Sequence, residues 1–193
     1  MAEGNFRRGF KAHCERLSVE EREGLGLKAW APLDPLVLAA EHGVPVVTFV
    51  ELSPHTNRPT TIAHLLSGAG SDAVSAFTVC QGSRRLIAVN PNHSLPRQAS
   101  SIAHELSHIL LEHDPDQTMP DKGIFSGRAW TPAMEAEASW CGGVLLLPRP
   151  AAVVFARNPS QRDQLQARYG VSEEMIEWRL RVTGAGRPPR ASG

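Results

Sequence analysis

The order of its periodic segments constrains this chain more than any other feature of the sequence. Apolar side chains recur at helical spacing over residues 96–112 and 133–147, and two strand-like runs over 76–80 and 85–90 precede them. The other expected elements are helices over 5–24 and 35–41, a strand over 44–52, a short helix over 61–67, and helices over 159–169 and 172–182. Helices, then a few strands, then more helices predict an α+β fold.

Turn-forming residues indicate where these elements end. Residues 81–84 predict a hairpin turn between the two strands, and the proline-containing stretches over 53–60 and 114–131 are expected to be irregular. Pro148 and Pro150 are expected to end the helix that precedes them.

The length of the chain is that of one domain. Of its 193 residues, we assign 1–184 to a single domain. Within it, residues 152–184 are expected to form a C-terminal helix pair, and residues 185–193 are expected to be a disordered tail.

Composition argues against a membrane protein or a general binder of polyanions. Twenty basic and 20 acidic residues cancel, so no overall field favours nucleic acid or an anionic surface. No window approaches the roughly 20 apolar residues of a membrane span, and the charged N-terminus does not read as a signal peptide. Cys14, Cys80 and Cys141 form no close pair in the sequence, which suits a reducing compartment. We expect a soluble, cytoplasmic protein with no membrane partner.

Residues 104–108 carry the clearest chemical signal, reading His104-Glu105-Leu106-Ser107-His108. Two histidines four residues apart on a helix differ by about 40° in direction and about 6 Å in height, so both can face one ion. Neutral imidazole is a common zinc ligand, so we expect His104 and His108 to bind one Zn²⁺. Glu105 would point beside the ion, where it can take a proton from a metal-bound water as the general base.

A catalytic zinc ion usually has a third protein ligand and one open position. His113 is expected to point away from the histidine pair, which leaves Glu135 and Glu137 on the following helix as candidates. Glu135 is the better candidate, because it shares a face with small residues such as Ser139 and Gly142, and that face can press closely on a neighbouring helix. Ser139, one turn from Glu135, can hydrogen-bond a ligating histidine.

The sequence resembles the ImmA/IrrE metallo-endopeptidases, which are gluzincin-like. The helix with the two histidines, together with Arg97-Gln98-Ala99-Ser100 before it, is similar to that family. So is the segment over 135–148, Glu-Ala-Glu-Ala-Ser-Trp-Cys-Gly-Gly-Val-Leu-Leu-Leu-Pro. Similarity extends over nearly the whole chain, but its specificity rests mainly on residues 97–148.

The resemblance implies a zincin-like fold, with a small antiparallel or mixed sheet packed on the active-site helix and helical segments at both ends. Carried over by position, it makes Glu105 the general base and gives zinc three ligands, His104, His108 and Glu135. Related chains often have Asn or Asp where this chain has Ser139. A hydroxyl orients an imidazole less strongly than a carboxylate does.

The predicted activity is that of a zinc-dependent endopeptidase. Glu105 would accept a proton during attack on a peptide carbonyl and return it to the leaving amine. One of the strands over 76–80 or 85–90 could pair with an extended substrate peptide. His93 and Tyr169 are candidate partners of the transition state, although each is more simply explained as a packed or surface side chain. The resemblance further implies the substrate, a helix-turn-helix repressor whose cleavage derepresses stress-response or mobile-element genes.

Two other functions are open on the same sequence. The helices over 159–169 and 172–182 have helix-turn-helix proportions, and their arginines could contact DNA phosphates: Arg162, Arg168, Arg179 and Arg181. We prefer the simpler interpretation that their apolar residues pack this pair onto the core: Leu165, Met175, Ile176 and Leu180. A zinc fold without turnover could also hold a peptide as a regulatory or antitoxin-like module.

Overall fold

A computed structural model describes residues 6–56, 58–68, 70, 72–82, 84–113 and 130–185. Its helices are α1 (Phe10–Gly24), α2 (Pro35–Glu41), α3 (Phe49–Leu52), α4 (Pro59–Leu66), α5 (Leu95–Leu110), α6 (Pro132–Leu146), α7 (Arg149–Arg157), α8 (Arg162–Tyr169) and α9 (Glu173–Thr183), with 3₁₀ turns at Ser53–His55 and Pro159–Gln161. The strands are β1 (Val46–Thr48), β2 (Ala76–Gln81) and β3 (Arg84–Val89). A helix-rich chain with one small sheet confirms the α+β class.

The three strands form a mixed sheet in the order β1-β3-β2. β1 runs parallel to β3, and β2 runs antiparallel to it. The expected hairpin turn is present, since Gln81 pairs with Arg84 and Gly82 has the positive φ, 59°, that a two-residue hairpin loop needs. β2 is therefore an edge strand among the described residues.

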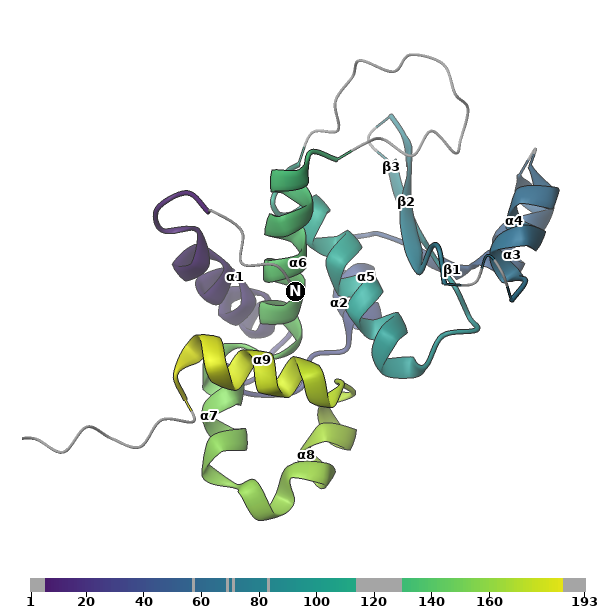
Figure 1. The fold of residues 1–193 in the computed structure, drawn as a ribbon. Helices are drawn as coiled ribbons and strands as arrows, with labels where there is room; N and C mark the ends of the chain where they lie inside the picture. The colour runs from purple at the N-terminus through teal and green to yellow at the C-terminus, as the bar shows by residue number, and fades with distance from the viewer. Residues whose placement is uncertain are drawn as a thin grey trace, which may run out of the picture.

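Helix α6 is the centre of the molecule, with α5 and α1 on either side and α7, α8 and α9 beneath (Figure 1). Its N-terminus is capped by Thr131, whose Oγ1 accepts a hydrogen bond from the backbone N–H of Met134. Ala138 and every residue over 140–147 are buried, so the C-terminal half of α6 is apolar on all sides because protein surrounds it. A second, smaller core joins the sheet to α3 and α4.

Two buried arginines hold the C-terminal end of α6. Arg22 of α1 donates to the carbonyls of Leu145 and Leu146, and Arg179 of α9 donates to the carbonyl of Leu147. The last carbonyls of a helix have no partner within it, and they lie at the negative end of its dipole. A cation from α1 and another from α9 therefore anchor this end of α6.

The strand expected over 44–52 is wrong in its second half. Only Val46–Thr48 is extended, and Phe49–Leu52 is the short helix α3. Thr48 and Glu51 form a capping box, in which each side chain accepts the other residue's backbone N–H. The capping box thus outweighs the strand preference of β-branched residues.

The prolines near residue 150 start a helix, α7, that was not predicted from the sequence. The helix α6 does end as expected, but Pro148 is the N-cap of α7 and Pro150 lies in its first turn. Proline fits the first turn because the N–H that it lacks has no intrahelical partner there. Residues 149–157 therefore form a helix of their own before the one expected over 159–169.

Smaller corrections concern element ends. The first helix begins at Phe10, the stretch over 53–60 contains a 3₁₀ turn and the start of α4, and residues 159–161 form a 3₁₀ turn before α8. The helix expected over 96–112 ends at Leu110. Most of the irregular stretch over 114–131, and all but the first residue of the expected tail over 185–193, lie outside the described residues.

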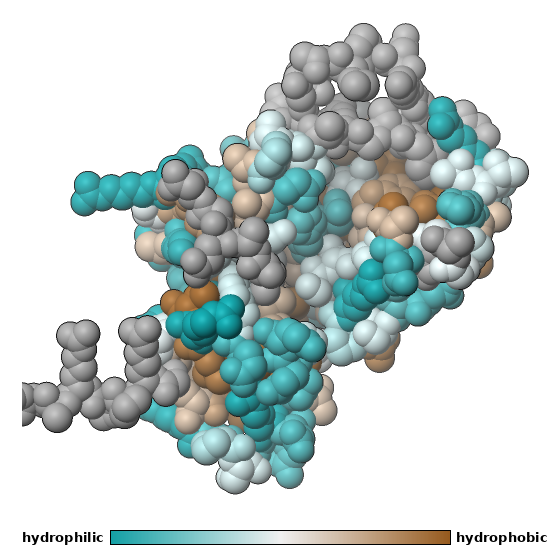
Figure 2. Space-filling view, in the orientation of Figure 1, coloured by the Kyte–Doolittle hydropathy of each residue, from teal (hydrophilic) through white to brown (hydrophobic). Residues whose placement is uncertain are grey.

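In the part of the chain that the structure describes, no single helix is long and apolar enough to cross a membrane. The bent pair α6 and α7, with 52° between its helices, passes that test only when both are counted together. On the face in Figure 2, hydrophobic residues reach the surface over the sheet and near α7 and α9, with hydrophilic residues between these areas.

Candidate functional site

The two histidines of α5 face the same point, as their spacing predicts. The Nε2 atoms of His104 and His108 are 3.2 Å apart. The His104 side chain is 25 % exposed, whereas that of His108 is 1 % exposed. One imidazole therefore lies at the surface of the site and the other at its base.

Helix α6 adds a carboxylate to this pair. Glu135, in the first turn of α6, places Oε2 3.2 Å from Nε2 of His104 and Oε1 4.0 Å from Nε2 of His108. The two helices approach closely at Gly142, where a Cβ would lie 3.1 Å from backbone atoms of Ala103 and His104. The small-residue face expected around Glu135 is thus the face that meets α5.

These three side chains fit a divalent metal ion. Their ligand atoms all lie within 4.8 Å of one another, and no other group of three such donors converges among the described residues. Bonds of about 2.0–2.1 Å in tetrahedral geometry place ligand atoms about 3.3 Å apart. The separations of 3.2, 3.2 and 4.0 Å are close to that value. Two imidazole nitrogens and a carboxylate oxygen are a set of ligands typical of zinc.

Glu105 lies beside this group and is held by the sheet. Thr78 of β2 donates a hydrogen bond from Oγ1 to Oε2 of Glu105, at 2.6 Å. Burial raises the pKa of Glu105 above its usual range, while the Thr78 bond and the charge of His104 oppose that rise. Thr78 was not predicted from the sequence, where its only signal is its position on an expected strand before the helix.

Both histidines of this group have a partner on their outer nitrogen. Oγ of Ser139 lies 3.3 Å from Nδ1 of His104, where Ser139 was expected to act. The expectation that His113 points away is wrong, because its Nδ1 lies 2.9 Å from Nδ1 of His108. Nε2 of His113 in turn lies 3.2 Å from Oε2 of Glu137. Glu137 thus contacts His113 and does not belong to the group around Glu135.

His108 is kept uncharged by its surroundings. Burial, and then the neighbouring His104 and His113, lower its pKa to about 3. The ring of Trp130 stacks on it, with 4.0 Å between ring centroids and 19° between planes. A neutral imidazole is the form that binds a metal, so His108 is ready to ligate at neutral pH.

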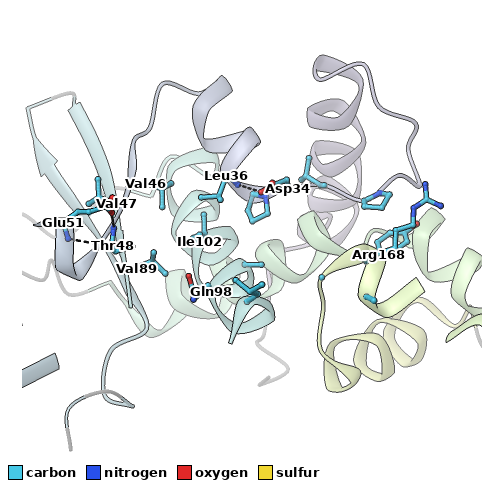
Figure 3. A pocket seen from close by; sticks show the side chains of 18 residues that line it. Asp34, Leu36, Val46, Val47, Thr48, Glu51, Val89, Gln98, Ile102 and Arg168 are labelled. Atoms are coloured by element: carbon cyan, nitrogen blue, oxygen red, sulfur yellow. Dashed lines mark hydrogen bonds between the residues drawn. The ribbon is translucent and has the colours of Figure 1, made fainter. Parts of the chain in front are cut away.

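Two cavities compete for the functional assignment. The larger, of 610 Å³, lies between β1, the start of α5 and the end of α8, with Val46, Val89 and Ile102 on one side and Arg168 at the other end (Figure 3). Its carboxylates are occupied, because Asp34 caps α2 and Glu51 closes the capping box of α3, as the dashed lines in Figure 3 show. Both carboxylates of the larger cavity therefore act as helix caps.

The smaller cavity contains the chemistry. It has a volume of 380 Å³ and is lined by His104, Glu105 and Glu135 together with residues 73–76 and two serines of α5. Convergent titratable groups in a cleft identify a candidate active site better than cavity size does. We therefore assign the site to this cleft.

Neither candidate partner of the transition state lines this cleft. The hydroxyl of Tyr169 donates to the backbone carbonyl of Trp30, and its ring packs against Phe155. His93 precedes α5, and His104 lies nine positions after Leu95, about 14 Å along the helix. The structure thus brings neither side chain to the ligand group.

The arginines of the C-terminal helix pair are partly engaged within the fold. Arg162 forms ion pairs with Glu173 and Glu177, and Arg179 is buried against Glu15. Met175 and Ile176 of α9 are buried in the main core, and Leu165 and Leu180 pack against it. The contacts of this pair are those of the packing interpretation.

The fold brings two of the cysteines together, although they lie far apart in the sequence. Cys14 and Cys141 are both fully buried and lie beside each other. Cys141 is a core thiol that contacts Ser107 rather than the ligand group.

One family model matches this chain. The family model of the IrrE N-terminal-like domain matches residues 56–181, more than half of the 193-residue chain and all of the candidate site. The chain belongs to this family. It is a peptidase family whose members are usually metal-dependent, so the chain is a metallopeptidase-family protein. Searches of curated proteins and of solved structures gave no match.

Proposed function

We propose that this IrrE-like protein is a zinc-dependent endopeptidase that cleaves a helix-turn-helix transcriptional repressor in the cytoplasm. The convergence of His104, His108 and Glu135, with Glu105 beside them in a cleft, carries the proposal. The zinc-dependent endopeptidase activity rests on this geometry. The choice of a repressor as the substrate rests on the resemblance to the ImmA/IrrE peptidases.

His104, His108 and Glu135 would hold the zinc ion through two Nε2 atoms and one carboxylate oxygen. When bound, zinc polarises a carbonyl and lowers the pKa of water to about 7. The partners of the outer nitrogens, Ser139 and His113, orient the two imidazoles.

Glu105 is the general base in this mechanism. Its carboxylate takes the proton that the attacking water loses and returns it to the amine nitrogen of the departing peptide half. The raised pKa suits this exchange, since a group that must accept and then release a proton works best when its pKa is near the working pH. Thr78 holds Oε2, which leaves Oε1 for the proton.

The edge strand β2 is the proposed docking site of the substrate. Residues 73–76, which lead into β2, line the cleft opposite α5, and β2 pairs only with β3 among the described residues. An extended peptide that pairs with such an edge would lie across the ligand group. A sheet packed on the helix with the two histidines is the zincin-like arrangement that we propose for the fold.

The first experiment separates the metal site from its alternatives. The purified chain should contain one zinc ion, Glu135→Ala should lose it, and Glu137→Ala should keep it when zinc is in excess. Elemental analysis with native mass spectrometry measures this. A one-to-one metal that survives Glu135→Ala would show that the third ligand is misplaced.

The second experiment tests turnover. The zinc-loaded chain is incubated with the helix-turn-helix repressor encoded beside its own gene, and mass spectrometry follows the fragments. Cleavage should stop with a chelator, and Glu105→Gln should retain zinc but lose most of the rate. A repressor that is bound and never cut would instead favour the peptide-binding module.

A further inference from the structure

The C-terminus of α5 ends in a turn that brings His113 back onto His108. The N–H of His113 donates to the carbonyl of His108, at 3.0 Å, and that of Glu112 donates to the carbonyl of Ile109, at 3.1 Å. These two bonds define a Schellman motif, in which the residue after the left-handed position lies over the residue five before it. An apolar pair often occupies these two places, but here both are histidines.

The left-handed position of this turn is occupied by an unusual residue. Glu112 has a φ of 53°, and it is the only non-glycine residue with positive φ in the described part of the chain. Such a conformation costs of order 1 kcal/mol or more for a residue with a Cβ, and it persists where the surrounding structure enforces it. The turn is thus maintained without the glycine that would form it most easily.

Three side chains beyond the ligand group form one hydrogen-bonded chain. Nδ1 of His113 lies 2.9 Å from Nδ1 of His108, and Nε2 of His113 lies 3.2 Å from Oε2 of Glu137. The side chains of His113 and Glu137 are 6 % and 21 % exposed, so water competes little for these contacts. Glu137 stands on α6, two residues after Glu135, and therefore joins this chain to the helix that supplies the third ligand.

The donors and acceptors in this chain fit only one arrangement when Glu137 is ionised and both imidazoles are neutral. A carboxylate only accepts, so Nε2 of His113 must carry a hydrogen and its Nδ1 must be a lone pair. Nδ1 of His108 must then donate, which leaves Nε2 of His108 as a lone pair. That Nε2 is the atom that faces His104 and Glu135.

We propose that His113 and Glu137 are positioning residues that fix His108 in the tautomer and orientation needed to ligate metal. This inference rests on the proposed metal site and deepens it. His104 has the hydroxyl of Ser139 on its outer nitrogen, whereas His108 has an imidazole backed by a carboxylate. His108, at the base of the site, therefore has the stronger hydrogen-bonding partner on its outer nitrogen.

The experiment measures zinc affinity rather than activity. Zinc is titrated against a chromophoric chelator with the full chain and with His113→Phe, which keeps a ring but removes both hydrogen bonds. We expect affinity to fall by about 10–100-fold, the usual effect of losing a partner of a ligating histidine. Glu137→Ala should fall by a similar factor, Glu137→Gln should recover part of the loss through its amide oxygen, and the double variant should be no worse than His113→Phe alone.

A matched pair elsewhere in the chain controls for the general effect of losing a His–Glu contact. Oε2 of Glu21, on α1, lies 2.7 Å from Nε2 of His42, at the end of α2. Both residues lie away from the ligand group. His42→Phe should leave zinc affinity unchanged. Glu112→Gly should also leave it unchanged or improve it, because glycine retains the left-handed turn.

A second readout separates positioning from a purely structural role. Without metal, His113→Phe and the parent chain should unfold at similar temperatures, and the stabilisation by added zinc should be smaller in the variant. In the zinc-loaded parent, ¹⁵N NMR should find the hydrogen of His108 on Nδ1. A loss of metal-free stability that accounts for the whole affinity change would overturn the proposal.

The failures of this inference and of the proposed function are distinguishable. Parent-like zinc affinity in His113→Phe and Glu137→Ala, with zinc lost in Glu135→Ala, would reject the positioning role and keep the metal site. A parent chain that binds no zinc, or a Glu135→Ala variant that binds it as well as the parent, would reject the metal site itself.

Discussion

The two ends of α6 bury polar groups in opposite ways. At the C-terminal end, every guanidinium nitrogen of Arg22 donates to a protein oxygen of Ser18, Ala31, Leu145 or Leu146. Donors meet acceptors there, and a cation meets the negative end of a helix dipole. Burial lowers the pKa of Arg22 to about 10, which still leaves it charged at neutral pH.

At the N-terminal end, two imidazole nitrogens and a carboxylate, all able to accept hydrogen bonds, lie close together. Nε2 of His104, Nε2 of His108 and the carboxylate of Glu135 converge within 4.8 Å. When both imidazoles present lone pairs, no protein donor lies among them, and a cation completes the group. Burial of polar groups alone therefore does not identify a functional site in this protein. The convergence of several possible metal-ligand atoms from two helices does.

The largest effect on stability should come from removing the hydrogen bonds of Arg22 at the C-terminal end of α6. Arg22→Leu removes the donors that reach the carbonyls of Leu145 and Leu146, and each unsatisfied buried carbonyl costs about 1–3 kcal/mol. We expect the free energy of unfolding to fall by about 3–5 kcal/mol, measured by denaturant titration at pH 7. The folded fraction should still bind one zinc ion. An unchanged unfolding midpoint would contradict the structural role of Arg22.

Adjacent glycines of α6 sharpen the comparison. A Cβ at Gly143 would lie 2.4 Å from the Trp178 ring, so Gly143→Ala should lower stability by about 1–3 kcal/mol. A Cβ at Gly142 would lie 3.1 Å from the backbone of Ala103 and His104, and it would push α5 from α6.

Gly142→Ala should therefore act mainly on the metal site. Its stability loss should be the smaller of the two, because alanine gains about 1 kcal/mol of helix propensity at each position and the clash at Gly142 is milder. Its zinc affinity should fall by about tenfold, as for other disturbances around a ligand, while Gly143→Ala keeps parent affinity. Equal zinc affinities in the two variants would show that the α5–α6 spacing does not control the site.

Glu105 should cost stability at neutral pH in the metal-free protein. Its raised pKa means that the folded chain keeps the proton at pH values where the unfolded chain, with a pKa near 4.5, has lost it. The stability that Glu105 contributes is therefore present below pH 4.5 and is lost as the pH rises through the raised pKa.

Glu105→Gln keeps the shape of this side chain without its charge. Its free energy of unfolding should match that of the parent below pH 4.5 and exceed it at higher pH, by about 1.4 kcal/mol for each unit by which the pKa is raised. The titration of His108 affects both proteins and cancels in the difference. Denaturant titrations between pH 4 and pH 8 measure this difference, and a constant gap would refute the assignment of a raised pKa.

The faces that side chains share within one regular helix could be predicted from the sequence. The periodicity of α5 placed His104 and His108 on one face, and that of α6 placed Glu135, Ser139 and Gly142 on another. These faces do meet in the structure, with Ser139 at His104 and Gly142 at Ala103. Helical geometry fixes such angles regardless of what surrounds the helix.

Relations beyond a helix end could not be predicted in the same way. His113 was expected to point away because the helix was continued through Glu112, whereas the chain turns there at a residue that is not glycine. Thr78 reaches Glu105 across 27 positions, and no periodic pattern reports such a contact. Residues 49–52 form a helix because of the capping box, although their composition is typical of a strand.

The smallest effect on stability should come from removing helix caps. Caps on α6 and α9 again allow a comparison between the candidate site and the core. Thr131 caps α6 and Ser172 caps α9, each by accepting one backbone N–H, at 3.2 and 3.3 Å. Thr131→Ala and Ser172→Ala should each lower the free energy of unfolding by about 1 kcal/mol. Only Thr131→Ala should also weaken zinc binding, because the first turn that it frays contains Glu135. Chelator competition and denaturant titration on both variants test this, and equal zinc affinities would mean that contacts with α5, rather than the cap, hold Glu135 in place.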